Sequence, residues 1–358
     1  MGRRLKRGAK INDRIYPIIT IIVLAVLTVG FVWAQTNLLL VKEITYSSIN
    51  IPRQYSGYKI AHISNIDNER QHLASKLKNK DVDIIIVSGG LVDSKGKYDK
   101  TIKELDELNK VADTFFVAQE QDIQYIDDIA SETDAVYLVG KNVILPEIKI
   151  TADEYIKLHC DDGITKQIEE GTDEAKKYVE YIAQELEKSK DERLQLVGVN
   201  GHNENIYDTK DELYALSDYS SSYRLLAFGN YKDADELTDT GVNIVMTGGT
   251  YGVIDELPIK DGSVTAGDYQ LFVSPGVCKS IPKNVGEKRF MNFTEIQIIN
   301  LHDGMIYKRN PLERFIDLFM NDTGTIFDND GGYSTYTYRY DEFEELRDEN
   351  YYKEKLHE

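Results

Sequence analysis

The stretch that decides the fold of this chain is "DIIIVSGGLVD", residues 83–93. The four β-branched residues 84–87 follow one another without a polar interruption, which predicts a strand that is covered on both faces. The strand runs into Gly89 and Gly90. Two glycines at the end of a strand indicate a phosphate cradle, a sharp corner, or a catalytic strand end from which a side chain has been removed. Other segments of the chain are needed to decide among these three.

Further strand-like runs alternate with amphipathic segments along the chain. Ile102, Leu105 and Leu108 recur at a spacing of three, and Tyr178 and Ile182 at a spacing of four, so each set lies on one face of a predicted helix. The alternation predicts one α/β domain over residues 45–305. Its expected strands are 58–64, 83–89, 114–118, 135–140, 194–199, 223–228, 242–247, 270–276 and 293–301.

Charge is distributed unevenly over the 358 residues. The formal net charge is −19, but residues 1–14 hold six basic side chains against one acid, so they carry +5 and the remainder −24. A strongly acidic domain is repelled by nucleic acid and by anionic lipid surfaces. We therefore expect no nucleic-acid partner.

An apolar segment follows the basic residues. Residues 18–34 are uncharged and predict a transmembrane helix over residues 17–41, after a basic cytoplasmic segment at residues 1–16. Basic residues before the helix predict a single-pass cell-membrane protein with a cytoplasmic N-terminus and its domain outside. The alternative is a cleavable signal peptide, because Val32 and Ala34 resemble the small residues before a cleavage site; the apolar run is longer than a signal core of about 7 to 15 residues.

Residues 306–358 differ in composition from the domain. They are acidic and rich in tyrosine, and Tyr336, Tyr338 and Tyr340 alternate with polar residues. This extension is either an added edge strand with the tyrosines on one face or a mobile segment. Cys160 and Cys278 match no metal-binding spacing and are expected to pack as small buried hydrophobes.

The order of these segments resembles the calcineurin-like metallophosphoesterases, in particular their bacterial membrane-anchored subgroup. "GYKIAHISNID" (57–67) stands where that family has a strand ending in S-D-x-H, and "DIIIVSGGLVD" stands where it has T-G-D-L-V-D. "VAQEQD" (117–122) replaces V-x-G-N-H-D/E, and "GVNG" (198–201) replaces G-V-D-D. The resemblance continues through residues 225–253 and 271–301. It implies a four-layer α/β/β/α sandwich.

The resemblance also implies a site of two divalent metal ions, and here the ligand positions are altered. The first Asp and His of the family fall on Asn65 and Asp67, and the bridging Asp falls on Gly90. The Asn ligand falls on Glu120, and the His beside it falls on Gln121. The remaining three His ligands fall on Gly229, Gly249 and Tyr251.

The replacements leave few side chains that can bind a metal ion. Divalent cations need anionic oxygen or imidazole ligands, and glycine offers no side chain. Asp67 and Glu120 are the strong donors that remain, so we expect no metal cofactor. The first hypothesis is a non-catalytic binding or scaffold module at the membrane with a protein or cell-envelope partner. The alternative is a residual or repurposed phosphoesterase that holds one metal ion with Asp67 and Glu120, with Asp93 or Asp122 as a further candidate ligand.

Other polar residues near the matched motifs are given structural roles. An alignment that makes His202 a ligand breaks the spacing of the later motifs, so His202 is assigned to a loop. His62 is expected to be a strand histidine. Asp93 and Asp122 match acids outside the direct metal shell and are expected to orient loops.

Overall fold

A computed structural model describes most of the domain. The described residues are 9–66, 72–159, 166, 168–171, 173–201, 209–211, 213–214, 222–229, 234, 237–248, 263–266, 268–278 and 294–303. The tyrosine-rich extension at 306–358 lies outside them.

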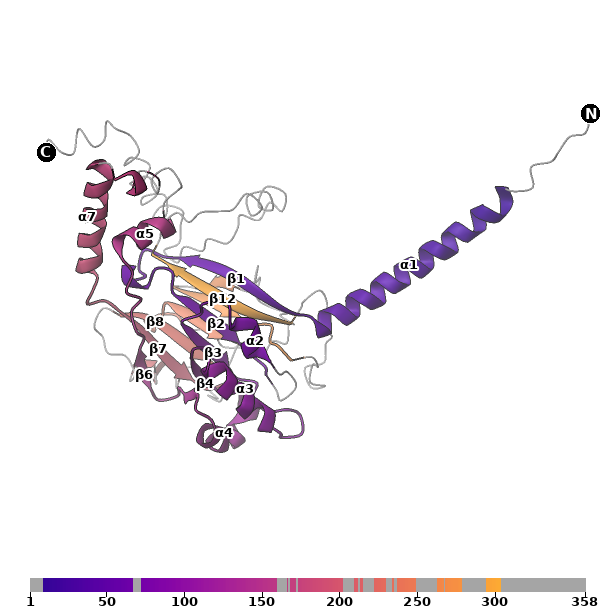
Figure 1. Cartoon of the computed structure of the whole chain (residues 1–358). Coiled ribbons are helices and arrows are strands. Elements are labelled where there is room, and N and C mark those ends of the chain that lie inside the picture. Colours follow the sequence, from indigo (N-terminus) through magenta and orange to yellow (C-terminus); the bar gives the residue numbers. More distant parts are fainter. Residues whose placement is uncertain are drawn as a thin grey trace, which may run out of the picture.

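Two six-stranded sheets form the domain in the described residues, which confirms the α/β class (Figure 1). The first sheet has the order β1 (Leu39–Ser47), β12 (Thr294–His302), β2 (Lys59–Ile63), β3 (Ile84–Ser88), β4 (Asp113–Val117) and β5 (Val136–Tyr137). The second has the order β10 (Ser263–Ala266), β11 (Tyr269–Val273), β9 (Ile244–Thr247), β8 (Ser222–Phe228), β7 (Arg193–Val199) and β6 (Asn142–Ile144).

Both sheets have a parallel centre. Strands β2 to β5 are parallel to one another, as are β7, β8, β9 and β11. The antiparallel neighbours are β12 beside β2, β6 beside β7 and β10 beside β11. All the expected strands are confirmed, and the strands that were not expected, β1, β6 and β10, lie at sheet edges.

The sheets pack face to face over a shared apolar core. Ile84 and Ile86 of β3 lie in one cluster with Leu225 of β8 and Met246 of β9, and all four side chains are fully buried. Because successive strand residues point to opposite faces, the intervening Ile85 belongs to a second cluster on the outer face of the first sheet. This double burial explains the uninterrupted apolar run of β3.

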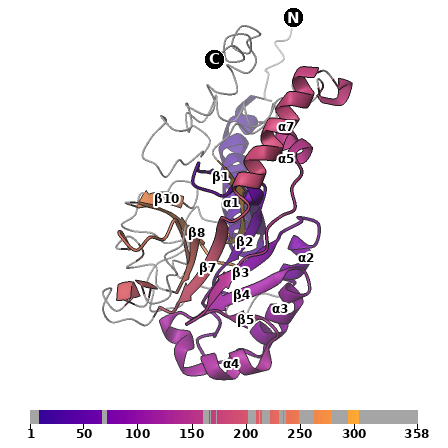
Figure 2. The same cartoon turned by 90° about the vertical axis from the view of Figure 1, so that its left-hand side faces the viewer.

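Helices cover that outer face (Figure 2). Leu105 and Leu108 of α3 and Leu73 and Leu77 of α2 are fully buried there. The helix predicted from Ile102, Leu105 and Leu108 is therefore confirmed. The helices are α1 (Ala9–Asn37), α2 (Leu73–Leu77), α3 (Asp99–Asn109), α4 (Ile126–Glu132), α5 (Ala152–His159) and α7 (Asp173–Lys188), with short 3-10 helices η1 (Arg53–Tyr55) and η2 (Glu120–Tyr125).

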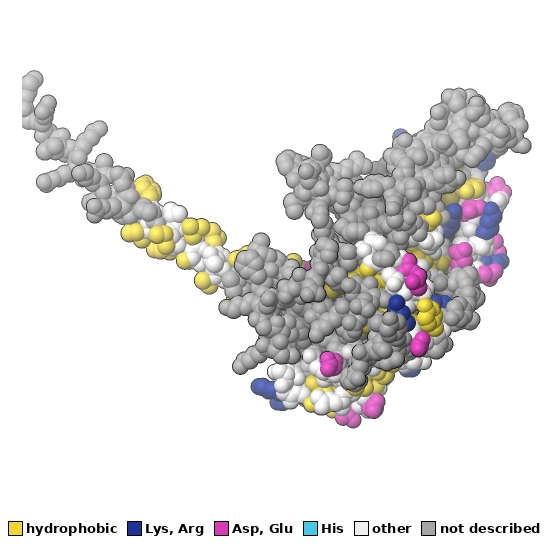
Figure 3. Space-filling view, turned by 180° about the vertical axis from the view of Figure 1, so that it is seen from behind, with side chains coloured by type: hydrophobic (Ala, Val, Ile, Leu, Met, Phe, Trp, Pro, Cys, Tyr) yellow, Lys and Arg dark blue, Asp and Glu magenta, His cyan; other side chains and the backbone are white. Residues whose placement is uncertain are grey.

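Helix α1 extends away from the sheets, and its apolar side chains are exposed (Figures 1 and 3). Among the side chains described, which within α1 are those of residues 16, 18–31 and 33–34, no helix is long and apolar enough to cross a membrane. The helix begins at Ala9, not at residue 17. It ends at Asn37, and residues 39–41, assigned above to the apolar segment, begin β1 instead because they pair with β12.

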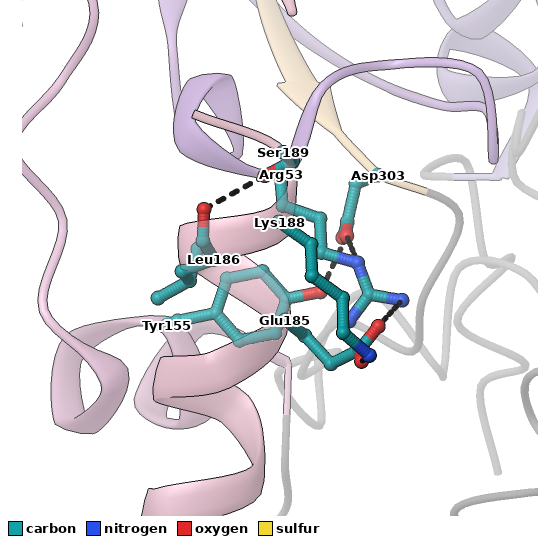
Figure 4. Close-up of polar contacts among 7 residues, drawn as sticks. All are labelled: Arg53, Tyr155, Glu185, Leu186, Lys188, Ser189 and Asp303. Atoms are coloured by element: carbon teal, nitrogen blue, oxygen red, sulfur yellow. Dashed lines mark hydrogen bonds and ion pairs between the residues drawn. The ribbon is translucent and has the colours of Figure 1, made fainter. Parts of the chain in front are cut away.

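A polar cluster holds α5 and α7 at the end of the sandwich where β12 finishes (Figure 4). Arg53 of η1 lies 3.5 Å from the Glu185 carboxylate of α7 and 3.7 Å from that of Asp303. Tyr155 of α5 donates a hydrogen bond to Asp303. The helices have a small apolar core of their own, which includes Ile182 as the sequence predicts. This helix pair marks the end of the molecule opposite α1.

Candidate functional site

The carboxyl ends of the parallel strands from both sheets meet at one edge, which we call the strand-end centre. It comprises residues 64–65, 88–92, 118–122, 200–201, 229, 247–248 and 274–277. Backbone hydrogen bonds join segments that are distant in sequence: Asn65 N–H donates to Gly89 O, Gly201 N–H to Ala118 O, and Val277 N–H to Ser64 O, each at 2.9 Å. Several positions selected from the sequence are therefore neighbours.

Gly90 packs directly on the backbone of Asn65. A Cβ atom at Gly90 would lie 2.5 Å from Asn65 Cα and 2.9 Å from Asn65 N, distances at which real Cβ atoms are essentially never found. The Gly90 φ angle is +71°, a conformation that strains any residue with a side chain. The position that the resemblance assigns to a bridging carboxylate is thus closed by backbone.

Glycine contacts also close the junction between the two sheets. A Cβ atom at Gly229 would lie 2.0 Å from Ala118 O and 2.5 Å from Gly201 N. At Gly248, the residue before Gly249, it would lie 2.2 Å from Ser64 Cβ. The glycines let the strand ends of the two sheets pack closely, with Gly229 against backbone and Gly248 against the Ser64 side chain.

Glu120 and Gln121 are exposed at the start of η2. Their neighbour Gln119, which the sequence analysis did not single out, is buried and caps η2. Gln119 Nε2 also donates a hydrogen bond to Ser88 O at 3.1 Å. The sequence does not predict this hydrogen bond from Gln119 to Ser88. In the family motif V-x-G-N-H-D/E the position of Gln119 is a glycine, so the motif assigns no side-chain role there.

Asp122 holds the glycine turn in position. Its fully buried carboxylate accepts hydrogen bonds from the N–H groups of Gly90, Leu91 and Val92 at 2.8 to 3.0 Å, and from Gln119 N–H at 2.9 Å. Burial raises the pKa of the Asp122 carboxyl to about 6, against the lowering effect of these four bonds. The prediction that Asp122 orients a loop is confirmed.

Asp93 has the same kind of role at the surface. Its Oδ1 accepts hydrogen bonds from Lys95 N–H at 2.8 Å and Lys97 N–H at 2.9 Å, which fixes the loop before α3. Asp93 thus binds backbone amides of its own turn, whereas Asp122 binds mainly those of the distant Gly90 turn. The loop-orienting role predicted for Asp93 is confirmed as well.

His62 is a buried strand histidine, as predicted. Its Nε2 lies 2.8 Å from Ser88 Oγ, and its Nδ1 lies 3.2 Å from Gln297 Oε1. Gln297 Nε2 donates to Val273 O at 3.1 Å, which leaves its Oε1 to accept the Nδ1 proton of His62. The histidine therefore links β2, β3 and β12 below the strand-end centre.

Acidification is expected to reduce the stabilisation that His62 provides. Burial lowers the pKa of the imidazole to about 4 from its ordinary 6.5, so between these pH values the unfolded chain binds a proton that the folded one does not. Stability that is present above pH 6.5 is lost as the pH falls toward 4, by about 3 kcal/mol. The raised pKa of Asp122 acts in the opposite direction, because the folded chain takes up that proton first.

The His62→Gln variant separates the two contributions, since Asp122 affects it and the wild type alike. We expect the stability advantage of the wild type over the variant to shrink by about 3 kcal/mol from pH 7 to pH 4. Urea unfolding at a series of pH values, followed by circular dichroism, measures this difference. An advantage that stays constant with pH would contradict the assignment.

Some candidate residues lie outside the described part of the chain. They are Asp67, Gly249, Tyr251, His202 and Cys160. Cys278 is described and is fully buried, as expected.

The residues that are described do not fit a pair of metal ions. Within the described ranges, no group of three or more His, Cys, Asp or Glu side chains is placed to hold a metal ion. Donor chemistry is unfavourable as well, because Gly90 and Gly229 carry no donor and their backbone contacts leave no room for one. Glu120 is a described carboxylate at a matched ligand position, and it is exposed.

Comparison with known proteins gives no assignment. No protein-family model matches the chain, and no curated protein matches it.

Proposed function

We propose that this chain is a membrane-anchored, extracytoplasmic protein with a metallophosphoesterase-like fold that acts as a non-catalytic binding or scaffold module. The α/β architecture with two packed sheets supports the proposed fold, because the resemblance places the metal site at the strand ends of a two-sheet sandwich. The four-layer α/β/β/α arrangement is part of the proposal.

The observation that carries the proposal is the contact of Gly90 with Asn65. A bridging carboxylate must extend from residue 90 into the space between two cations, and two-metal catalysis depends on ions held about 3.5 to 4 Å apart. Here the backbone of Asn65 occupies the place of the first side-chain atom. Because of this contact, residue 90 has no room for the bridging carboxylate on which a shared metal site depends.

Anchoring rests on α1 and on the charge distribution. Apolar side chains such as Leu24, Leu27 and Trp33 are about 60% exposed on α1, as suits a helix whose surroundings are lipid. The six Lys and Arg residues within 1–14, immediately before the apolar segment, favour a cytoplasmic N-terminus. We propose a protein or cell-envelope component as the partner.

We expect the purified protein not to hydrolyse simple phosphomonoesters or phosphodiesters with added manganese. Without a bridging carboxylate the ions that activate water and bind phosphate have no shared ligand. A colorimetric phosphate-ester assay of full-length protein measures this directly. Metal-dependent turnover that is lost in Asp67→Ala or Glu120→Ala would overturn the proposal and favour the hydrolase with one metal ion.

A further inference from the structure

Helix α1 joins the first sheet at the end where the strand-end centre lies. The helix ends at Asn37, and two residues later Leu39 begins β1, paired with Thr294 at the beginning of the parallel strand β12. Because β12 runs antiparallel to β2, the beginning of β12 lies beside the carboxyl end of β2, with Gln297 opposite His62. The chain therefore leaves α1 at the same end of the sheet at which β2 reaches Asn65.

The parallel strands of the second sheet also have their carboxyl ends beside the beginning of β12. Gln297, near the beginning of β12, donates a hydrogen bond to Val273 O at the carboxyl end of β11. Ser274, the next residue, donates its N–H to Thr247 O at the end of β9, at 2.9 Å. Glu295 N–H donates to Gly276 O at 3.3 Å. The carboxyl ends of both sheets thus surround the beginning of β12, next to the root of α1.

The opposite end of the sandwich carries the helix pair. Ser47, the last residue of β1, pairs with His302, and the next residue, Asp303, binds Tyr155 and Arg53 of the polar cluster. Figure 1 shows the same separation, with α1 leaving the sheets at one end and α5 and α7 lying at the other. The two ends of the domain are therefore distinguishable by their distance from α1.

We propose that the strand-end centre faces the lipid surface into which α1 inserts, and that its partner is a zwitterionic lipid surface. This inference rests on the proposed anchoring of α1. After the three polar residues 35–37, exposed apolar side chains recur where the chain enters the domain, at Leu38, 46% exposed, and Leu40, 42% exposed, which suits contact with the interfacial region of a bilayer. The charge of −24 after the basic segment opposes anionic lipid, so a lipid surface without net charge is the one that fits.

Energy transfer from single labelled cysteines to the membrane tests this orientation. Asp113 and Glu120 form a matched pair, because both are exposed acids that flank the same strand, Asp113 at its amino end and Glu120 beyond its carboxyl end. At 3.3 Å per residue they are roughly 20 Å apart. Asp113→Cys and Glu120→Cys are made in full-length protein with Cys160→Ser, and the buried Cys278 is left in place.

Each variant is labelled with a donor dye and reconstituted into phosphatidylcholine vesicles that contain an acceptor-labelled lipid. We expect more efficient transfer from residue 120 than from residue 113. Equal efficiency or the reverse order would overturn the inference.

A third label at Leu40→Cys separates the possible failures. Transfer from residue 40 with the wrong order at 113 and 120 refutes the orientation alone. Absence of transfer from residue 40, or failure of the protein to float with the vesicles, refutes the anchoring and with it the inference.

Discussion

Replacing Gly90 by alanine is expected to lower the free energy of unfolding by about 2 to 5 kcal/mol. The positive φ angle accounts for about 1 to 2 kcal/mol of this, because a Cβ atom is strained in the left-handed region. The remainder comes from overpacking, since the new methyl group must displace the backbone of Asn65, and such insertions typically cost 1 to 3 kcal/mol. Urea unfolding followed by circular dichroism measures the loss.

Gly140→Ala is the matched control. Gly140 has a φ angle of +70°, nearly that of Gly90, but a Cβ atom there meets nothing within 4 Å. Its replacement should therefore cost only the conformational strain of about 1 to 2 kcal/mol. Equal losses at the two positions would show that the strand-end centre has room for a side chain at residue 90.

The second large effect is expected at Asp122. In Asp122→Asn an amide NH₂ group replaces one of the two carboxylate oxygens, each of which accepts two backbone hydrogen bonds. Two buried N–H groups then face a donor, and each unsatisfied group costs about 1 to 3 kcal/mol. We expect a net loss of about 1 to 3 kcal/mol in the free energy of unfolding at pH 7, because removing the buried charge, whose desolvation raises the pKa of Asp122, offsets part of the cost of the unsatisfied groups.

Asp93→Asn controls for the change of a carboxylate to an amide. One oxygen of Asp93 accepts both N–H bonds, at the surface, so the asparagine oxygen can take its place. The expected cost is within about 0.5 kcal/mol, as for most surface substitutions. A similar cost in the two variants would mean that Asp122 does not hold the Gly90 turn.

The pattern of apolar residues predicts the central strands of both sheets but misses the edge strands β1, β6 and β10. Strands such as β3 are buried on both faces, so their sequences are apolar throughout and easily recognised. Only the polar residues 35–37 and Leu38 separate β1 from the apolar residues of α1, and hydrophobicity alone does not tell a helix from a strand there. The pairing of β1 with β12, more than 250 residues later, decides. β6 and β10 are short and mixed in polarity because they are edge strands.

The sequence predicts which residues form the candidate site, but not that backbone contacts close it. The sequence indicates that glycines stand at residues 90 and 229, and the strand order predicts that these positions meet at one edge. That they meet by direct backbone contact depends on sub-ångström packing between two sheets, which no sequence pattern reports. The role of Gln119 as a bridge from η2 to Ser88 depends on the same packing.

The metal content of the full-length protein, purified without chelators, decides whether the strand-end centre has lost its ions. Elemental analysis for manganese, iron and zinc counts bound ions per chain without assuming a substrate. Because Gly90 and Gly229 provide no donors and the backbone fills their surroundings, we predict that no metal is present in stoichiometric amount. One or two tightly held ions per chain would contradict the account.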